Sequence, residues 1–293
     1  DTSAEPLIKA ASIVAPLGGI GIDINMGCPA PEIYRHGAGM MWMNKDLSET
    51  GKMLEKIKCV MQTENTSCSR LSVKCRLGEE DFTEEKFFAF IDMLISSGVT
   101  QIVLHPRSRK QKYSRPAQWS YVQKLYEHVA AIESKNPSAT AENKPHISII
   151  GNGDISSPET AKKALEIAPD IDGLMLARYA VQKPWLFSQI ERELNGSQSE
   201  LNRPQHENTG ATHKEQNLDL YDFTEQYLSD IREYQPKEFW KTRTQRFFAY
   251  FCDNFSFAHY LKTKMINSEN HTEQLAILKE YFEKMPTERV IKI

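Results

Sequence analysis

Apolar and polar positions follow two alternating patterns in the first two thirds of the chain. Short runs rich in β-branched residues predict strands, and they occupy residues 21–25, 72–77, 101–105, 147–151 and 173–177. Stretches with apolar residues three or four positions apart predict amphipathic helices, and they occupy residues 47–62, 84–97, 117–133 and 158–168. Strands that are apolar on both faces and alternate with helices favour a parallel sheet, either a barrel or a doubly wound fold.

The start of the last of these helices is marked locally. Ser157 precedes Pro158 and Glu159. A serine at the N-cap, a proline at the first helical position and an early acid together favour a helix that begins at Pro158.

The pattern changes near residue 196. Residues 196–217 contain few large apolar side chains and many Gly, Ser, Asn, Gln and His residues, which predicts a surface linker. Beyond it the helical spacing continues without strand alternation, at residues 218–234, 237–252 and 272–284. We therefore expect a β/α domain over residues 1–195, a linker over 196–217 and an all-helical domain over 218–293.

Composition narrows the class of protein. The chain has 293 residues, of which 40% are hydrophobic and 26% charged, so it can form a real core and is not a disordered or collagen-like chain. Its net charge of −3 argues against a polycationic nucleic-acid binder, although it leaves room for a local basic patch. No stretch is apolar enough to predict a transmembrane helix, so we expect no membrane association.

The cysteines indicate a reducing environment. Five of them occur at irregular spacing and without a C-x-x-C motif, which fits neither a disulfide scaffold nor a zinc site. We therefore expect a cytoplasmic protein without a metal.

Candidate reactive groups follow the strands, because the carboxyl ends of parallel strands collect the active sites of β/α folds. Cys28 lies between Gly27 and Pro29 directly after the first strand. A thiol fixed on such a turn can act as a nucleophile or a proton donor, and a buried structural cysteine is an equally good interpretation.

Two further groups lie on the next strands. Lys74 interrupts an apolar strand and would need an anionic or polar partner inside a barrel, unless it is an exposed lysine on a half-covered strand. His105 ends the third strand and is a candidate mainly because other polar groups end the neighbouring strands.

A phosphate site is predicted after the last two strands. Gly151, Asn152, Gly153 and Asp154 form a glycine-containing turn before the capped helix, where free amide groups and a helix N-terminus suit a phosphate. Arg178, one strand later, follows Ala177 and can add a bidentate contact.

Basic residues are concentrated after the third strand. This segment carries no acid, and basic residues interleaved with an aromatic suit a nucleic-acid backbone, although solvated basic loops are common. The basic side chains are Arg107, Arg109, Lys110, Lys112 and Arg115. In the C-terminal segment, Lys237, Lys241, Arg243 and Arg246 recur beside Trp240, where an ordinary charged helix face is the simpler interpretation.

Taken in order, these motifs resemble the tRNA-dihydrouridine synthase family. The matching pieces are DINMGCP at 23–29, GAG at 37–39, SVKCRLG at 72–78, HPRSRKQKYSRPAQW at 105–119, IGNGDISSPETA at 150–161 and DGLMLARYAVQKPWLF at 172–187. They occur in the family's order over about residues 4–190, and the family also has a helical tail.

The resemblance implies a TIM (β/α)8-type barrel that binds FMN and reduces the C5–C6 bond of a uridine in tRNA, with NADPH or NADH as the reductant. It implies that Cys28 is the acid and that Lys74 and His105 contact the flavin ring. It further implies an FMN phosphate site at Asn152, Gly153, Asp154, Ala177 and Arg178, and a monomer that binds tRNA through its helical domain.

Some features depart from the family. Ala177 stands where the family usually has glycine, and the Ala-Pro-Met flavin contact of the family's early strands has no counterpart here. Five strands are three short of a closed barrel, so we expect that this chain lacks the first three strands and exposes strand edges. Two other interpretations are another FMN barrel such as a dihydroorotate dehydrogenase, and an RNA-binding relic without flavin.

Overall fold

The computed structural model describes residues 4–63, 68–79, 82–111, 115–135, 146–201 and 217–293. The chain divides into two compact units. The first comprises Asp1–Asp154 and Lys162–Met175, and the second Ile155–Ala161 and Leu176–Ile293. The predicted division into a β/α domain and a separate C-terminal domain remains a prediction.

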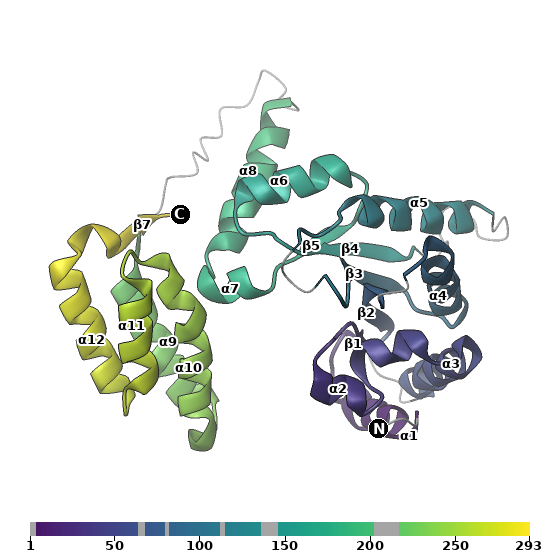
Figure 1. Cartoon of the computed structure of the whole chain (residues 1–293), viewed down its shortest axis with the longest axis horizontal. Coiled ribbons are helices and arrows are strands. Elements are labelled where there is room, and N and C mark those ends of the chain that lie inside the picture. The colour runs from purple at the N-terminus through teal and green to yellow at the C-terminus, as the bar shows by residue number, and fades with distance from the viewer. Residues whose placement is uncertain (1–3, 64–67, 80–81, 112–114, 136–145, 202–216) are drawn as a thin grey trace. The chain divides into compact units, whose positions relative to one another are not determined.

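The first unit is built on a parallel sheet, as the alternating pattern predicted. Its strands lie in sequence order, β1 to β5, and each pairs in parallel with the next (Figure 1). Their bounds are β1 Gly21–Met26, β2 Arg70–Gly78, β3 Gln101–Ser108, β4 Ser148–Asn152 and β5 Gly173–Met175.

Helices connect these strands. A register shift between Arg76 and Gly78 lets β3 run to Ser108, three residues beyond the predicted end. The helices are α1 Glu5–Val14, α2 Pro31–Arg35, α3 Leu47–Thr63, α4 Glu84–Ser96, α5 Ser120–Ser134 and α6 Pro158–Ile167, with 3-10 segments at Ala15–Leu17 and Gly39–Asn44. The backbone N–H of Thr160 donates to Ser157 Oγ at 3.3 Å, which confirms the predicted cap of α6.

The two faces of the sheet differ in chemistry. Successive side chains of a strand point to opposite faces, and the register aligns residues of like character. One face carries fully buried apolar side chains such as Val73, Leu104 and Ile149. The other carries Lys74 and Arg76 of β2, with Arg76 in register with His105 of β3. A polar face on a parallel sheet is unusual and marks this side as the one available for chemistry.

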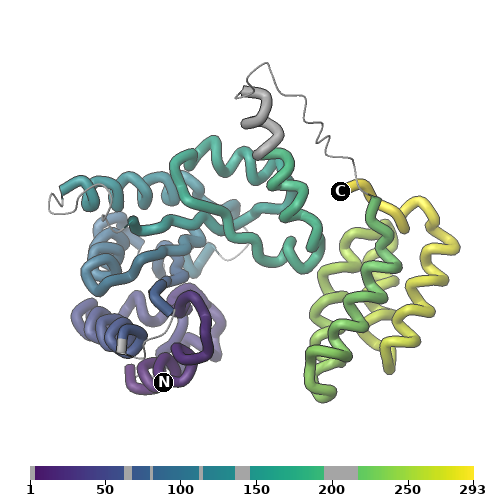
Figure 2. Tube along the Cα trace, turned by 180° about the vertical axis from the view of Figure 1, so that it is seen from behind, coloured from purple at the N-terminus to yellow at the C-terminus, as the bar shows by residue number. Residues whose placement is uncertain are grey.

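The second unit consists of helices and two short strands. Its helices are α7 Arg178–Gln182, α8 Leu186–Leu201, α9 Leu220–Tyr234, α10 Trp240–Phe251, α11 Ala258–Asn267 and α12 His271–Lys284, with 3-10 segments at Lys237–Phe239, Cys252–Asn254 and Pro286–Glu288. Helices α9 to α12 pack side by side, as the green-to-yellow tubes of Figure 2 show. None of the described helices is both long and apolar enough to cross a bilayer.

Two predictions about this region are wrong in detail. The C-terminal segment is not all helical, because β6 Asn217–Asp219 pairs antiparallel with β7 Val290–Lys292. Each strand has only three residues, too few for an alternating pattern to be visible in the sequence. The predicted linker also starts too early, since α8 continues to Leu201, and residues 202–216 lie outside the described residues.

The core of the second unit is aromatic. Phe247, Phe248 and Phe251 of α10 are at most 3% exposed and pack on one another, with the rings of Phe247 and Phe251 stacked at 4.7 Å between centroids. Leu261 of α11 and Leu278 of α12 are fully buried in the same cluster. Burial of these large side chains holds the four helices together.

Candidate active site at the carboxyl ends of the strands

The turn after β1 fixes the position of Cys28. The side-chain Oδ1 of Asn25 accepts hydrogen bonds from the backbone N–H groups of Gly27 and Cys28, both at 3.1 Å. An asparagine that bonds to the backbone two and three residues ahead forms a rigid local turn. The half-buried thiol is therefore presented by the backbone at the end of the strand.

Contacts from distant residues hold the same turn. Arg76 Nε donates to the Gly27 carbonyl at 3.0 Å, and the N–H of Met40 donates to the Cys28 carbonyl at 3.0 Å. Gly39 has φ +59°, and a Cβ there would lie 2.6 Å from the Cys28 carbonyl oxygen. Only glycine allows this close approach.

Lys74 lies next to this turn on the polar face. It is in register with Asn25 of β1. Burial lowers the pKa of its ammonium group, and the nearby charge of Arg76 acts in the same direction, whereas Asp23 and Cys28 raise it. Lys74 is therefore a partly desolvated donor on the polar face of the sheet rather than a fully exposed lysine.

His105 is kept neutral. Burial, followed by the charges of Arg76, Lys74 and Arg107, lowers its pKa to about 3. Its Nε2 lies 3.2 Å from Nη1 of Arg107. Because a guanidinium can only donate, Nε2 accepts and the imidazole proton is on Nδ1. The structure thus defines one tautomer of a neutral histidine.

The guanidinium of Arg107 is buried rather than solvent-facing. Its Nη2 contacts Oδ2 and Oδ1 of Asp154 at 2.7 and 2.8 Å, and its Nε donates to the Arg115 carbonyl at 2.8 Å. The Arg107 side chain is 3% exposed. The interpretation of Arg107 as a member of an exposed basic loop is therefore wrong. Linear charge patterning shows the cation but not the distant carboxylate that buries it.

The turn after β4 is held mainly by its side chains. Asn152 Nδ2 donates to the Met175 carbonyl at 2.7 Å, and Asp154 Oδ2 accepts the N–H of Ala117 at 2.7 Å. Gly153 adopts φ +136°, where a Cβ would lie 2.8 Å from Ala117 Cβ. Both polar side chains of the turn are thus bonded within the protein.

The remaining predicted residues are distributed over both units. Ala177 and Arg178 are exposed at the start of α7 in the second unit, and the strand before them ends at Met175 rather than at Ala177.

In the basic loop, Arg109 pairs with Glu79 at 3.3 Å and lies over the Tyr34 ring at 3.9 Å. Lys110 and Arg115 are exposed, and Lys112 lies outside the described residues.

Of the other cysteines, three are buried and one is exposed. Burial raises the pKa of Cys75 and of Cys252 to about 12, so both remain protonated thiols. Cys68 is buried and Cys59 is exposed on α3. Among the described residues, no group of three or more His, Cys, Asp or Glu side chains is placed to hold a metal ion.

Three site residues were not identified from the sequence. Asn25 could have been found, because an Asn two residues before a Gly-Cys pair is a local turn signal. Arg76 shares a strand face with Lys74, which a period of two would have shown. Trp119, whose Nε1 donates to the Gly153 carbonyl at 3.2 Å, left no local signal because its partner is 34 residues away.

A parallel β/α sheet with a positioned thiol, a desolvated lysine and a neutral histidine along one polar face defines the class of β/α-fold enzymes that react at the carboxyl ends of their strands. The sequence model of the family described as Dihydrouridine synthase (Dus) matches residues 1–286. The chain therefore belongs to the dihydrouridine synthase family.

Several curated relatives carry related names. A tRNA-dihydrouridine(47) synthase of Vanderwaltozyma polyspora, with NAD(P)(+) in its name, is 31% identical over 62% of this chain and 27% of its own length. A similarly named protein of Xenopus tropicalis is 35% identical over 59% of this chain and 23% of its own. A probable tRNA-dihydrouridine synthase of Helicobacter pylori is 37% identical over 58% and 44%. The match thus spans less than half of each relative.

Proposed function

We propose that this chain belongs to a flavin-dependent enzyme that reduces the C5–C6 double bond of a uridine in tRNA, with NADPH or NADH as the source of electrons. The observation that carries the proposal is the Asn25 turn, which presents the Cys28 thiol beside Lys74. Family membership and the names of the relatives support the same reaction.

The polar face of the sheet suits a flavin ring. Flavins carry carbonyl and ring-nitrogen acceptors on one edge, and Lys74 supplies a donor while His105 Nδ1 supplies a second. Both side chains lie on neighbouring strands on the same face. When bound, FMN supplies the hydride that is added to C6 of the uracil.

Cys28 then provides the proton. Hydride addition to C6 places negative charge on C5 and the adjacent carbonyl, and the Cys28 thiol transfers its proton to C5, leaving a thiolate that is reprotonated from solvent. Asn25 and Arg76 hold the turn so that the Sγ stays at the strand end. Their role is positioning, because both bond to the backbone of the turn.

A neutral His105 serves this chemistry. An imidazolium on the polar face would repel Lys74 and Arg76, whereas the neutral ring can donate through Nδ1 without adding charge. Arg107 fixes the ring, and Asp154 compensates the charge of Arg107.

The phosphate and the tRNA complete the proposal. We assign the FMN phosphate to the backbone of Asn152, Gly153 and Asp154, with Ala177 and Arg178 as further contacts. For the tRNA we propose Arg109, Lys110, Lys112 and Arg115, without Arg107. We also retain the expectation of a closed barrel, whose remaining strands would adjoin the described sheet.

Deletion of the encoding gene tests the function. Dihydrouridine should disappear from defined tRNA positions, return on re-expression of the wild-type protein, and fail to return with Cys28→Ala. Cys59→Ala, which changes an exposed thiol on α3, is the matched control and should restore the modification. Unchanged dihydrouridine at every position, or turnover of free dihydroorotate by the purified protein, would reject the proposal.

A further inference from the structure

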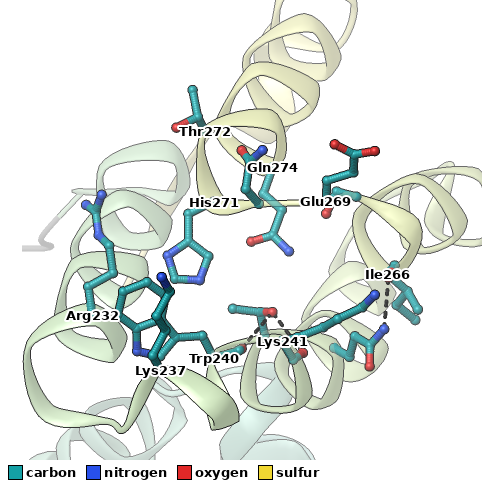
Figure 3. Close-up of a pocket in the computed structure, with 13 residues that line it drawn as sticks. Arg232, Lys237, Trp240, Lys241, Ile266, Glu269, His271, Thr272 and Gln274 are labelled. Carbon is teal, nitrogen blue, oxygen red and sulfur yellow. Dashed lines mark hydrogen bonds between the residues drawn. The ribbon is translucent and has the colours of Figure 1, made fainter.

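A pocket of about 390 Å³ opens between α10 and the start of α12 in the second unit. This volume is in the range of roughly 300–1,000 Å³ that small-molecule sites occupy. Figure 3 shows Trp240 and Lys241 on one side of the pocket and His271 and Gln274 on the other. All of its lining residues belong to the second unit and are distinct from the Cys28 site.

The pocket is lined by three cationic side chains and one carboxylate. Arg232, Lys237 and Lys241 contribute the positive charges and Glu269 the negative one. An excess of cations around a concave site favours an anionic ligand.

One wall of the pocket is aromatic. The rings of Trp240 and His271 lie 5.6 Å apart between centroids at an angle of 34°. The indole Nε1 of Trp240 donates to the Gln235 carbonyl at 2.9 Å, so Trp240 offers the pocket its ring and no donor. Aromatic rings beside cations form the common binding surface for an unstacked base and its phosphate.

Two buried polar atoms in this pocket lack a partner within the described part of the chain. Gln274 is 3% exposed, and its Nε2 donates to the Met265 carbonyl at 3.4 Å, yet its Oε1 has no hydrogen-bond partner among the described residues. The same holds for Nδ1 of His271. Burial and the charge of Arg232 lower the pKa of His271, so the ring is neutral and Nδ1 accepts when the proton is on Nε2.

Unpaired buried acceptors are costly and call for a donor from a ligand. The unpaired Oε1 of Gln274 can accept from the exocyclic amine of adenine or cytosine, whereas uracil carries a carbonyl oxygen at the position of the cytosine amine. We propose that this pocket binds one unpaired RNA nucleotide whose base carries an exocyclic amino group, with the base against Trp240 and its phosphate near Lys237 and Lys241.

Tryptophan fluorescence tests this site. The whole protein is titrated with the pentaribonucleotides A5, C5 and U5, and A5 and C5 should quench at concentrations about tenfold lower than U5. Trp240→Phe should remove the difference in quenching between A5 and U5, because the other three tryptophans, Trp42, Trp119 and Trp185, lie outside the pocket.

Two variants separate base recognition from charge. Gln274→Leu should bring A5 and U5 to within about twofold of each other, because the unpaired acceptor is gone. Lys241→Gln should weaken all three oligonucleotides and reduce the salt dependence by about one phosphate contact. Lys279→Gln, an exposed lysine of α12 outside the pocket, is the control and should change neither.

Equal binding of U5 and A5, or a difference between A5 and U5 that persists in Trp240→Phe, would overturn the proposal. Quenching by AMP at the concentrations that A5 requires would assign the pocket to free nucleotides and overturn the RNA assignment. Retained circular dichroism in each variant excludes unfolding as the cause. Because the readout is binding, it stays informative if the gene deletion leaves dihydrouridine unchanged.

Discussion

The Nη2 atom of Arg107 donates to both carboxylate oxygens of Asp154, at 2.7 and 2.8 Å, and forms an ion pair with this carboxylate. The partners come from β3 and from the turn after β4, so this pair ties two strand ends together. It also fixes the ring of His105, which contacts the same guanidinium.

Removing the carboxylate should destabilise the fold. Asp154→Asn leaves the buried guanidinium without its counter-charge, so the free energy of unfolding should fall by about 2 to 3 kcal/mol. Urea denaturation measures this change. Asp92→Asn, which breaks the more exposed pair with His128 at 2.6 Å, is the control and should lower the free energy of unfolding by less than about 1 kcal/mol. Equal losses in both variants would contradict the buried role of Arg107.

The neutral state of His105 predicts a pH dependence. Its pKa is about 3 in the folded protein against 6.5 as the ordinary value, so between these limits the unfolded chain binds the proton and the folded chain does not. Because of His105, the free energy of unfolding therefore decreases as the pH falls below about 6.5.

Between pH 7 and pH 5 the titration of His105 should lower the free energy of unfolding by about 1 to 2 kcal/mol. His105→Gln should reduce the pH dependence of the unfolding free energy by that amount, as measured by urea denaturation at both values. His36→Gln, which removes an exposed histidine, serves as the reference for the loss of a histidine side chain. A His105→Gln slope equal to that of the wild type would show that His105 titrates normally.

Alkylation should distinguish the accessible cysteines from the buried ones. At pH 8 the folded protein should react with iodoacetamide at the half-buried Cys28 and the exposed Cys59, because both are accessible. Cys75 and Cys252 should stay unmodified, since they are buried and their pKa values of about 12 leave almost no thiolate. Peptide mass spectrometry identifies the labelled sites, and all five cysteines should react in urea. Labelling of Cys75 in the folded state would show that β2 is not buried as described.

Two glycines with a left-handed backbone allow the cost of backbone strain alone to be compared with the cost of strain plus a steric clash. Gly18→Ala, at φ +83° with no atom within 4 Å, should cost only about 1 kcal/mol for the backbone. Gly39→Ala, at φ +59°, would also press a methyl group against the Cys28 carbonyl oxygen at 2.6 Å, and should cost about 2 kcal/mol or more. Thermal unfolding compares the two, and Gly39→Ala should also impair restoration of dihydrouridine. Equal costs would indicate that Gly39 can move away from the Cys28 turn.

The sequence by itself determined the β/α alternation, the order of the five strands along the chain and the strand-end position of Cys28. These follow from local rules, because the period of apolar residues records which face of each element is buried. The helix cap at Ser157 was predictable for the same reason, since its acceptor and donor are three residues apart.

Only the tertiary structure decided how the polar residues are used. Arg107 looked like one member of an exposed basic loop, but it is buried because Asp154 lies 47 residues further along the chain. Gln274 lies within the helix predicted at residues 272–284, and only the packing of α12 against α11 shows that its Oε1 has no partner among the described residues. Burial and pairing of a charge depend on contacts between distant segments, and a one-dimensional pattern carries no record of those contacts.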